Sequence, residues 1–338
     1  MKLKTLALAT GFALAAMSAA GSAQASALAT SVLDITNFQI SNSSGTRLTN
    51  ADFTALLLTD TADMSAQLGA TTNGNGGSSP GTGINLTGAG GLFAKVGTVL
   101  PAYAADTFAV YTSSGGTSPV SNFALADQII AGSPIGAGPL GHAGQSAYVS
   151  LLGSGQDGSS TANNGLNSSF IFKLASAGAV TLSFDARAYL EAYTSALETF
   201  PTNASAQYSL VFTIDDLDTG GTNIVTWKPD GANNAGSAGA FGIQAGLEAD
   251  CFNLNDGISR NAPFNGYSIR GSAYGAAKEC SAGTGTGFSA TTVALSTHSY
   301  QFTIRSTATA DAATVPEPAT LALLGMGLLG LGFSRRRA

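Results

Sequence analysis

The sequence predicts an all-β fold, an antiparallel β-sandwich of jelly-roll type, for the body of the chain. The composition combines 43 glycines with only 10% charged residues in 338, and glycine together with β-branched residues is typical of short strands joined by long turns. Several stretches also alternate apolar and polar residues with a period of two, the pattern of a strand that buries one face. No fixed-period repeat occurs, which disfavours solenoids and propellers.

Four segments are expected to be strands, at 32–40, 182–192, 208–214 and 300–305. The second is the clearest, because its even positions are apolar from Leu182 to Ala192 and its odd positions are mainly polar. Strands of this kind pair into sheets that bury one face in a shared core.

Between these strands we expect loops rich in Gly, Ser and Asn, at 69–91, 132–165, 231–242 and 281–287. They contain too little apolar surface to order themselves and are expected to be flexible. Helical signals are few, and segments 51–58 and 123–130 are each expected to form a short helix.

The N-terminus has the three parts of a secretory signal peptide. A positive start, Met1-Lys2-Leu3-Lys4, is followed by an apolar segment at 6–16 and by the A-x-A pattern Ala23-Gln24-Ala25. We therefore expect signal peptidase to remove residues 1–25, so that the mature body spans 26–314.

The charged residues divide sharply between the ends and the body. Five of the 14 Lys and Arg lie at the two termini, which leaves nine basic against 20 acidic residues between them. A body with this excess of negative charge repels polyphosphates, so we expect no binding of nucleic acid.

The C-terminal segment 315–338 has three distinct parts. Val315-Pro316-Glu317-Pro318 precedes an uncharged, largely apolar stretch at 319–333, and Arg335, Arg336 and Arg337 follow it. A helix must begin after Pro318, because proline disfavours helix at the residue before it. We expect a short transmembrane helix with the arginines on the cytoplasmic side, which leaves the body outside the inner membrane.

These three parts, in this order, resemble the PEP-CTERM sorting domain of Gram-negative bacteria. The resemblance is confined to the segment 315–338 and implies processing by an exosortase, a membrane enzyme thought to cut near Pro-Glu-Pro. It also implies a genome that makes exopolysaccharide, and hence a final location at the cell surface or in the extracellular matrix. The alternative is a plain C-terminal anchor that is never cleaved.

Cys251 and Cys280 are the only cysteines. An exported chain meets an oxidising compartment, so we expect a disulfide between them, worth roughly 3–4 kcal/mol in the chain-entropy model. A reactive thiol pair would be expected to show C-x-x-C spacing, which is missing here, and two buried free thiols are the other alternative.

No catalytic constellation is evident. The two histidines, His142 and His298, are far apart, and the chain has no H-E-x-x-H, no G-x-S-x-G and no Walker loop. Paired carboxylates for glycoside hydrolysis are available among Asp185, Glu191 and Glu198, as they are in any body with this many acids. We therefore expect a non-enzymatic surface or matrix protein with no cofactor, associated with exopolysaccharide or biofilm. The alternatives are a secreted carbohydrate-active enzyme and a calcium-dependent carbohydrate-binding protein.

Two groups of residues are candidate binding sites. Asp215, Asp216 and Asp218 lie in a turn that ends in two glycines and offer hard oxygen ligands for Ca²⁺, although a solvated Asx-rich turn explains the same residues. Tyr189 and Tyr193 flank Glu191 on one side of the 182–192 strand, where the rings offer a stacking surface for sugars. The alternative is that these tyrosines pack against neighbouring strands.

Overall fold

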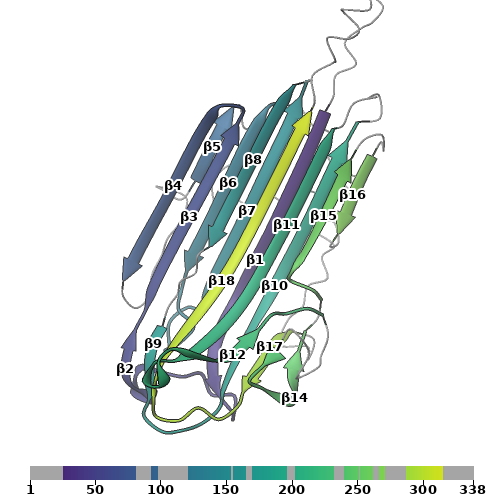
Figure 1. The fold of residues 1–338 in the computed structure, drawn as a ribbon. Helices are drawn as coiled ribbons and strands as arrows, with labels where there is room; N and C mark the ends of the chain where they lie inside the picture. The colour runs from purple at the N-terminus through teal and green to yellow at the C-terminus, as the bar shows by residue number, and fades with distance from the viewer. Residues whose placement is uncertain are drawn as a thin grey trace, which may run out of the picture.

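The computed structural model describes residues 26–80, 93–97, 121–153, 155–164, 170–195, 202–231, 240–250, 252–261, 266–270 and 287–314. Within these ranges the chain is almost entirely strand, every strand pair is antiparallel, and there is no α-helix (Figure 1). The predicted all-β, antiparallel class is therefore confirmed.

The strands form two sheets. Sheet A has eight strands, in the spatial order β14 (Ile243–Ala249), β17 (Phe288–Thr292), β10 (Val180–Thr194), β1 (Ser26–Asn42), β7 (Gly141–Leu152), β6 (Phe123–Ala131) and β5 (Phe93–Gly97), with β16 (Gly266–Arg270) paired to β10. Sheet B has ten strands. Seven follow the order β13 (Ala240–Phe241), β12 (Thr222–Trp227), β11 (Asn203–Asp216), β18 (Ser299–Thr314), β8 (Gln156–Asn164), β3 (Thr59–Leu68) and β4 (Thr71–Pro80).

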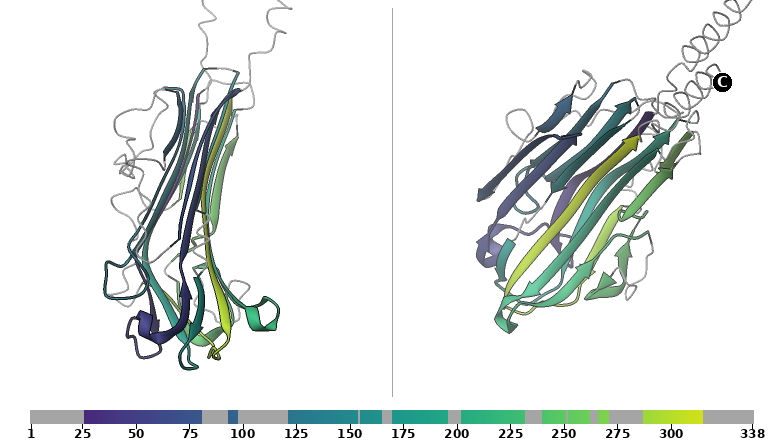
Figure 2. Two further views of the ribbon diagram at one scale, coloured as in Figure 1. Left: turned by 90° about the vertical axis from the view of Figure 1, so that its left-hand side faces the viewer. Right: turned by 45° about the horizontal axis from the view of Figure 1, so that its top comes forward.

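Three further strands complete sheet B: β15 (Asp256–Asn261) pairs with β11, β9 (Phe170–Leu174) with β18, and β2 (Phe53–Leu57) with β9. Two short 3-10 turns, η1 (Asn50–Asp52) and η4 (Leu217–Thr219), are the only helical turns in the described ranges. Figure 2 shows the two sheets edge-on as facing layers.

Aromatic side chains fill the core between the sheets. The Phe38 ring lies 6.4 Å from Phe184 of sheet A, and 5.9 Å and 6.5 Å from Phe212 and Phe302 of sheet B. Trp227 is fully buried and stacks on Phe212 at 5.0 Å. These contacts across the layers bury large apolar areas, the main favourable term in folding.

The four predicted strands all fall within longer observed ones, namely β1, β10, β11 and β18. In β10 the even positions Leu182, Phe184 and Leu190 are 0% exposed and belong to the core, as their period of two predicts.

The two predicted helices are wrong. Segment 123–130 is strand β6, which is buried on both faces over most of its length, so its sequence lacks the alternation that marks a strand with one wet face. In segment 51–58 only η1 is helical, closed where the Thr49 N–H donates to Asp52 Oδ2 at 2.7 Å. The chain is extended again from Phe53, because β2 pairs with β9.

The predicted flexible loops are wrong in part, since β4 lies in segment 69–91 and both β7 and β8 lie in segment 132–165. Small residues are used here to bring the sheets close together. A Cβ added to Gly158 of β8 would lie 2.8 Å from Val149 Cγ1 of β7. The low apolar content of segment 132–165 therefore reflects close packing of the two sheets.

Both ends of the described body lie at the same end of the two sheets. Ser26 pairs with Leu152, and the Thr314 hydroxyl donates to the Gly153 carbonyl at 2.6 Å. Figure 1 shows β1 beginning and β18 ending together, whereas η1, η4, β2 and β9 lie at the opposite end. We call these the terminal end and the loop end. No helix in the described ranges is long and apolar enough to cross a membrane.

Candidate functional site

Tyr189, Glu191 and Tyr193 lie on one side of β10, as predicted, but two of them are inaccessible. Tyr189 is 1% exposed, Glu191 is 0% exposed, and the Tyr189 hydroxyl donates a 2.8 Å hydrogen bond to Glu191 Oε2. Tyr193 is half-buried. A surface that stacks sugars must be open to them, so the expected accessible face is wrong for Tyr189 and Glu191.

Tyr189 belongs instead to a second apolar cluster, on the face of sheet A that points away from sheet B. The buried members of this cluster are Val32, Phe123, Leu125, Tyr148 and Tyr189. Val32 of β1 stands directly opposite Tyr189 in the register. The alternative expectation, packing on a neighbouring strand, is what the structure shows for Tyr189.

The acidic turn at the end of β11 is held by hydrogen bonds within the chain. Asp216 Oδ1 accepts from the Asp218 N–H at 3.0 Å and caps η4, and Asp216 Oδ2 lies 2.8 Å from His298 Nδ1. Asp218 Oδ2 accepts from the Ser299 N–H at 3.2 Å. Gly220 closes the turn with a φ of 83°, which suits glycine.

Asp215 is separated from this network because consecutive residues of a strand point to opposite faces. Its Oδ1 accepts from Asn223 Nδ2 at 2.9 Å. Within the described part of the chain, no three Asp, Glu, His or Cys side chains converge as a metal site. The geometry therefore favours the Asx-rich turn over a preformed calcium loop.

The contact with His298 has an electrostatic consequence. The hydrogen bond from His298 is the largest influence that holds the pKa of Asp216 below its usual value, and the main-chain N–H of Asp218 acts in the same direction. Asp216 is thus a stable anion that ties the turn to the start of β18. The histidine half of this pair was not predicted, because 82 residues separate the two side chains.

A surface groove lies at the loop end of the molecule. It is formed by Asn50 and the connection 131–142, and encloses about 1150 Å³ including its open mouth. Gly132 is required at its edge, since its φ is 73° and an added Cβ would lie 2.1 Å from the Leu140 carbonyl oxygen.

Arg47 fixes the shape of this connection. Its guanidinium donates to the carbonyl oxygens of Ser133, Pro134 (3.3 Å), Ile135 (3.1 Å), Gly138 (2.8 Å) and Pro139 (3.4 Å). Burial lowers the pKa of Arg47 from its ordinary value. A planar cation with five donors suits a curved loop that presents several carbonyls to one point.

His142 lines the groove and is oriented by a carboxylate. Its Nε2 lies 2.8 Å from Asp34 Oδ1 on the neighbouring strand β1. An ionised carboxylate only accepts, so Nε2 carries a proton and donates it, which leaves Nδ1 as an acceptor whenever the ring is neutral. Nδ1 makes no hydrogen bond to any described residue, and the His142 side chain is 33% exposed.

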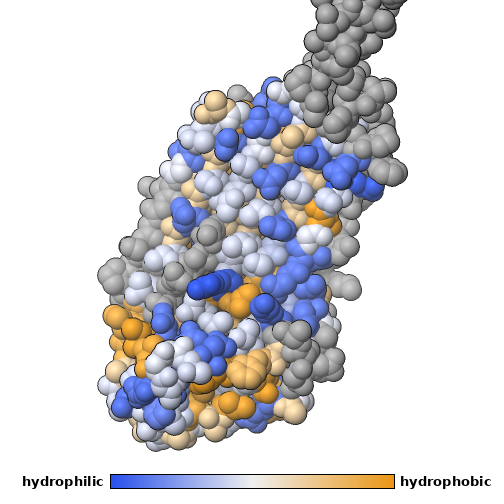
Figure 3. Space-filling view, in the orientation of Figure 1, coloured by the Kyte–Doolittle hydropathy of each residue, from blue (hydrophilic) through white to orange (hydrophobic). Residues whose placement is uncertain are grey.

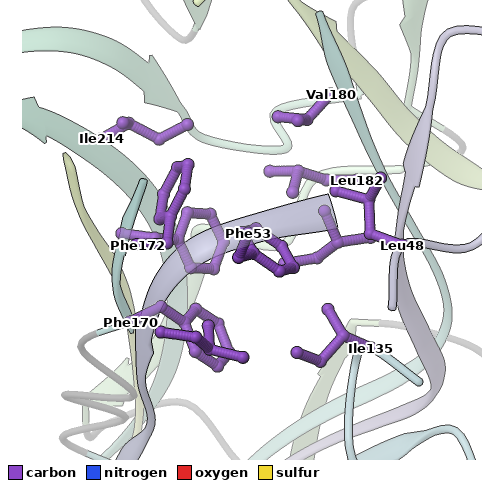
Figure 4. Close-up of a pocket in the computed structure, with 11 residues that line it drawn as sticks. Leu48, Phe53, Ile135, Phe170, Phe172, Val180, Leu182 and Ile214 are labelled. Carbon is purple, nitrogen blue, oxygen red and sulfur yellow. The ribbon is translucent and has the colours of Figure 1, made fainter. Parts of the chain in front are cut away.

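Next to the groove, between the two sheets, lies a wholly apolar pocket (Figure 4). In Figure 4 Phe170, Phe172 and Ile214 face Val180, Leu182 and Ile135 across it. The space is about 360 Å³ with its mouth included, and the unfilled part is about the size of one water molecule. Ile135 lines both the pocket and the groove.

Apolar side chains also reach the surface near this pocket. Leu57 of β2 and Ile171 of β9 stand opposite each other and are 52% and 38% exposed. Figure 3 shows this apolar patch at the loop end. The patch and the pocket lie on opposite faces of the same short strand pair.

Two buried carboxylates lie at the end of β14, and one of them, Glu248, is close enough to Trp227, the only tryptophan, for the indole to affect its pKa. Glu248 and Asp250 are 6% and 4% exposed, and the Asp230 N–H donates to Asp250 Oδ2 at 2.8 Å. Burial raises the pKa of Asp250 to about 7 and is the largest cause of a raised pKa at Glu248, where the Trp227 indole acts in the opposite direction. Neither Glu248 oxygen makes a hydrogen bond of normal geometry with described residues.

Several predicted sites lie outside the described residues. They are the signal peptide, both cysteines of the expected disulfide, Glu198, the sorting motif Val315 to Pro318, and Arg335, Arg336 and Arg337. The expected transmembrane helix lies there too.

Comparison with known proteins concerns only the C-terminal segment. No curated protein and no solved structure matches the chain. Residues 314–337 match the PEP-CTERM protein-sorting motif, which identifies the end of this chain as the signal of an exosortase-targeted, exported protein.

Proposed function

We propose that the protein is a non-enzymatic component of the cell surface or extracellular matrix, delivered by signal peptidase and exosortase and associated there with exopolysaccharide or biofilm. The observation that carries the proposal is the sorting motif at residues 314–337. In this proposal the precursor is held briefly in the inner membrane by a helix within 319–333, with the arginines on the cytoplasmic side.

The fold supports display of the body away from a membrane. Ser26 and Thr314 lie together at the terminal end, so both processed segments join the body there. The β6–β7 connection that forms the groove, the strands β2 and β9 that carry the apolar patch, and the turn after β11 that carries the aspartates all lie at the loop end (Figure 1). While the tail is in the membrane, this arrangement turns the loop end outward.

We assign the two antiparallel sheets to a jelly-roll-like sandwich, and we expect a Cys251–Cys280 disulfide in the mature protein. The non-catalytic role rests on the surroundings of the two imidazole rings: among the described residues each ring hydrogen-bonds an aspartate, and no serine or threonine hydroxyl hydrogen-bonds either ring. Ser133 Oγ, in the groove with His142, accepts from the Ile135 N–H at 3.3 Å instead.

The test is the intact mass of native protein recovered from envelopes and from culture medium. We expect a mature form that lacks residues 1–25 and 319–338. Replacing Pro316, Glu317 and Pro318 with alanine should leave the protein in the inner membrane, because the apolar stretch and the arginines survive. Native protein that carries the tail in every fraction would contradict processing and favour a plain anchor.

A carbohydrate-active enzyme is the second candidate, and it makes a different prediction. Purified body should then release reducing ends from the exopolysaccharide of the producing cells. We expect no release from wild type. Release that Asp34→Asn or His142→Ala abolishes would replace the matrix role with an enzymatic one.

A further inference from the structure

The groove and the apolar pocket adjoin each other at the loop end, and one side chain separates them. Ile135 is 5% exposed and lines both spaces. Its loop is fixed to the core, because the Gly136 N–H donates to the Leu48 carbonyl at 2.7 Å and the Ile40 N–H donates to the Pro134 carbonyl at 2.9 Å. These bonds hold the backbone of Ile135, so a passage between the two spaces can open only through a rotamer change of its side chain.

The pocket selects for apolar groups. Every side chain that lines it is aliphatic or phenylalanine, so a polar group placed there would lose its hydrogen bonds to water without replacement. The pocket has almost no free space while Ile135 points inward, so a ligand must displace this side chain. An unbranched alkyl chain is the slimmest group that can do so.

The groove selects for uncharged polar groups. Asn50 offers an amide, Ser133 a hydroxyl and His142 an unused ring nitrogen. No described residue that lines the groove is a lysine or an arginine. The nearby Arg47 is directed at five main-chain carbonyls, and Asp34 behind His142 repels an anion. A cation finds no free carboxylate lining the groove, since Asp34 is paired with His142.

We propose that the groove and the pocket form one binding site for a small uncharged amphiphile. Its alkyl chain passes Ile135 into the pocket, and its hydroxyl-bearing head hydrogen-bonds Asn50 and His142. This site is independent of the sorting signal.

The proposal is tested with the full mature body and a series of methyl, butyl and hexyl β-D-glucosides below their micellar concentrations. Saturation-transfer NMR and calorimetric titration report binding and Kd. We expect Kd to fall by up to about fourfold for each added methylene that enters the pocket, from about 0.8 kcal/mol per buried methylene. Equal Kd values for the methyl and hexyl compounds would overturn the proposal, as would no binding of either.

Three variants separate the two halves of the site. Asn50→Ala, an exposed change, should weaken hexyl glucoside several-fold and leave 1-hexanol unaffected. Ile135→Ala removes the partition and should tighten hexyl glucoside, whereas Val180→Leu narrows the pocket and should weaken it. Leu247→Ala, an exposed residue of β14, is the matched control and should change nothing.

The same variants also define the results that would contradict the proposed site. If Ile135→Ala unfolds the protein, the other two variants still test the proposal. Asn50→Ala tests the hydrogen bond to the head of the ligand, and Val180→Leu tests the entry of its alkyl chain into the pocket. Unchanged Kd in both folded variants would place the glucoside elsewhere and refute the site. Hexanol that binds wild type as tightly as hexyl glucoside would refute the amphiphile class.

Discussion

The Tyr189 hydroxyl donates a 2.8 Å hydrogen bond to Glu191 Oε2, two residues along the same face of β10, and both side chains are buried. A carboxylate withdrawn from water requires donors, because its desolvation is costly. The pair thus stabilises a polar position within an otherwise apolar cluster, a structural role in place of the predicted sugar-binding role.

The first prediction follows from this bond. Tyr189→Phe removes one donor to a buried carboxylate and should lower the free energy of unfolding by about 1–3 kcal/mol. Urea unfolding measures it, with Tyr193→Phe as the matched change on the same strand face. A free energy of unfolding for Tyr189→Phe equal to that of wild type would show that the hydrogen bond to Glu191 contributes little.

Strand β10 shows which parts of the fold could be predicted from the sequence. Alternation in 182–192 correctly predicts the strand and the side on which Tyr189 and Glu191 lie. It carries no information on whether the outer side is covered, because a strand buried on both faces keeps the same backbone period. Segment 123–130 shows the opposite case. Its strand, β6, is buried on both faces, so its sequence does not alternate between apolar and polar residues, and the strand was not predicted.

The groove was beyond prediction for a different reason. Arg47 joins carbonyls that lie 86 to 92 residues further along the chain, and His142 meets Asp34 across 108 residues. Each residue alone is an ordinary loop or strand residue. Only the pairing of β1 with β7 brings them together.

The second prediction concerns the aromatic core. Phe212 contacts Phe38, Phe184 and Trp227 and is 1% exposed. Phe212→Ala leaves a cavity between the sheets and should cost about 3–5 kcal/mol. Phe241→Ala, at a position that is 61% exposed, should stay within about 0.5 kcal/mol of wild type. Comparable losses in the two variants would contradict the assigned core.

The third prediction is the disulfide between Cys251 and Cys280. Peptide mapping without reduction should recover the two cysteines linked, and Cys251→Ser should cost about 2–5 kcal/mol. The double variant Cys251→Ser/Cys280→Ser should be no less stable than the single one, since the loss is that of one cross-link. Two alkylatable thiols in periplasmic protein would rule the bond out.

The fourth prediction tests the acidic turn. Both oxygens of Asp216 and one of Asp218 are already used by His298 and by main-chain N–H groups, so we expect millimolar Ca²⁺ to leave the Tm unchanged. A ligand specific to the folded state would raise it. A rise in wild type that Asp218→Ala removes would instead establish the predicted calcium site.

The last prediction is a dependence of stability on pH that arises at Asp250. Its pKa is about 7 in the folded protein against an ordinary 3.8, so the unfolded chain releases this proton at lower pH than the folded one. The contribution of Asp250 to stability is therefore full below about pH 4 and is lost as the pH rises to about 7. About three pKa units correspond to at most about 4 kcal/mol, and residual contact with solvent reduces this figure.

The variant Asp250→Asn distinguishes the titration of Asp250 from that of the other carboxyl groups. The amide oxygen can still accept from the Asp230 N–H but has no proton to release, so the variant should unfold at higher urea than wild type at pH 8, with a smaller difference at pH 5. Trp227, the only tryptophan, reports the transition from beside the site. Glu248 and Asp311 have raised pKa values as well, so a weaker slope in the same direction should persist in the variant. Parallel pH profiles for variant and wild type would show that Asp250 titrates no differently in the folded and unfolded chains.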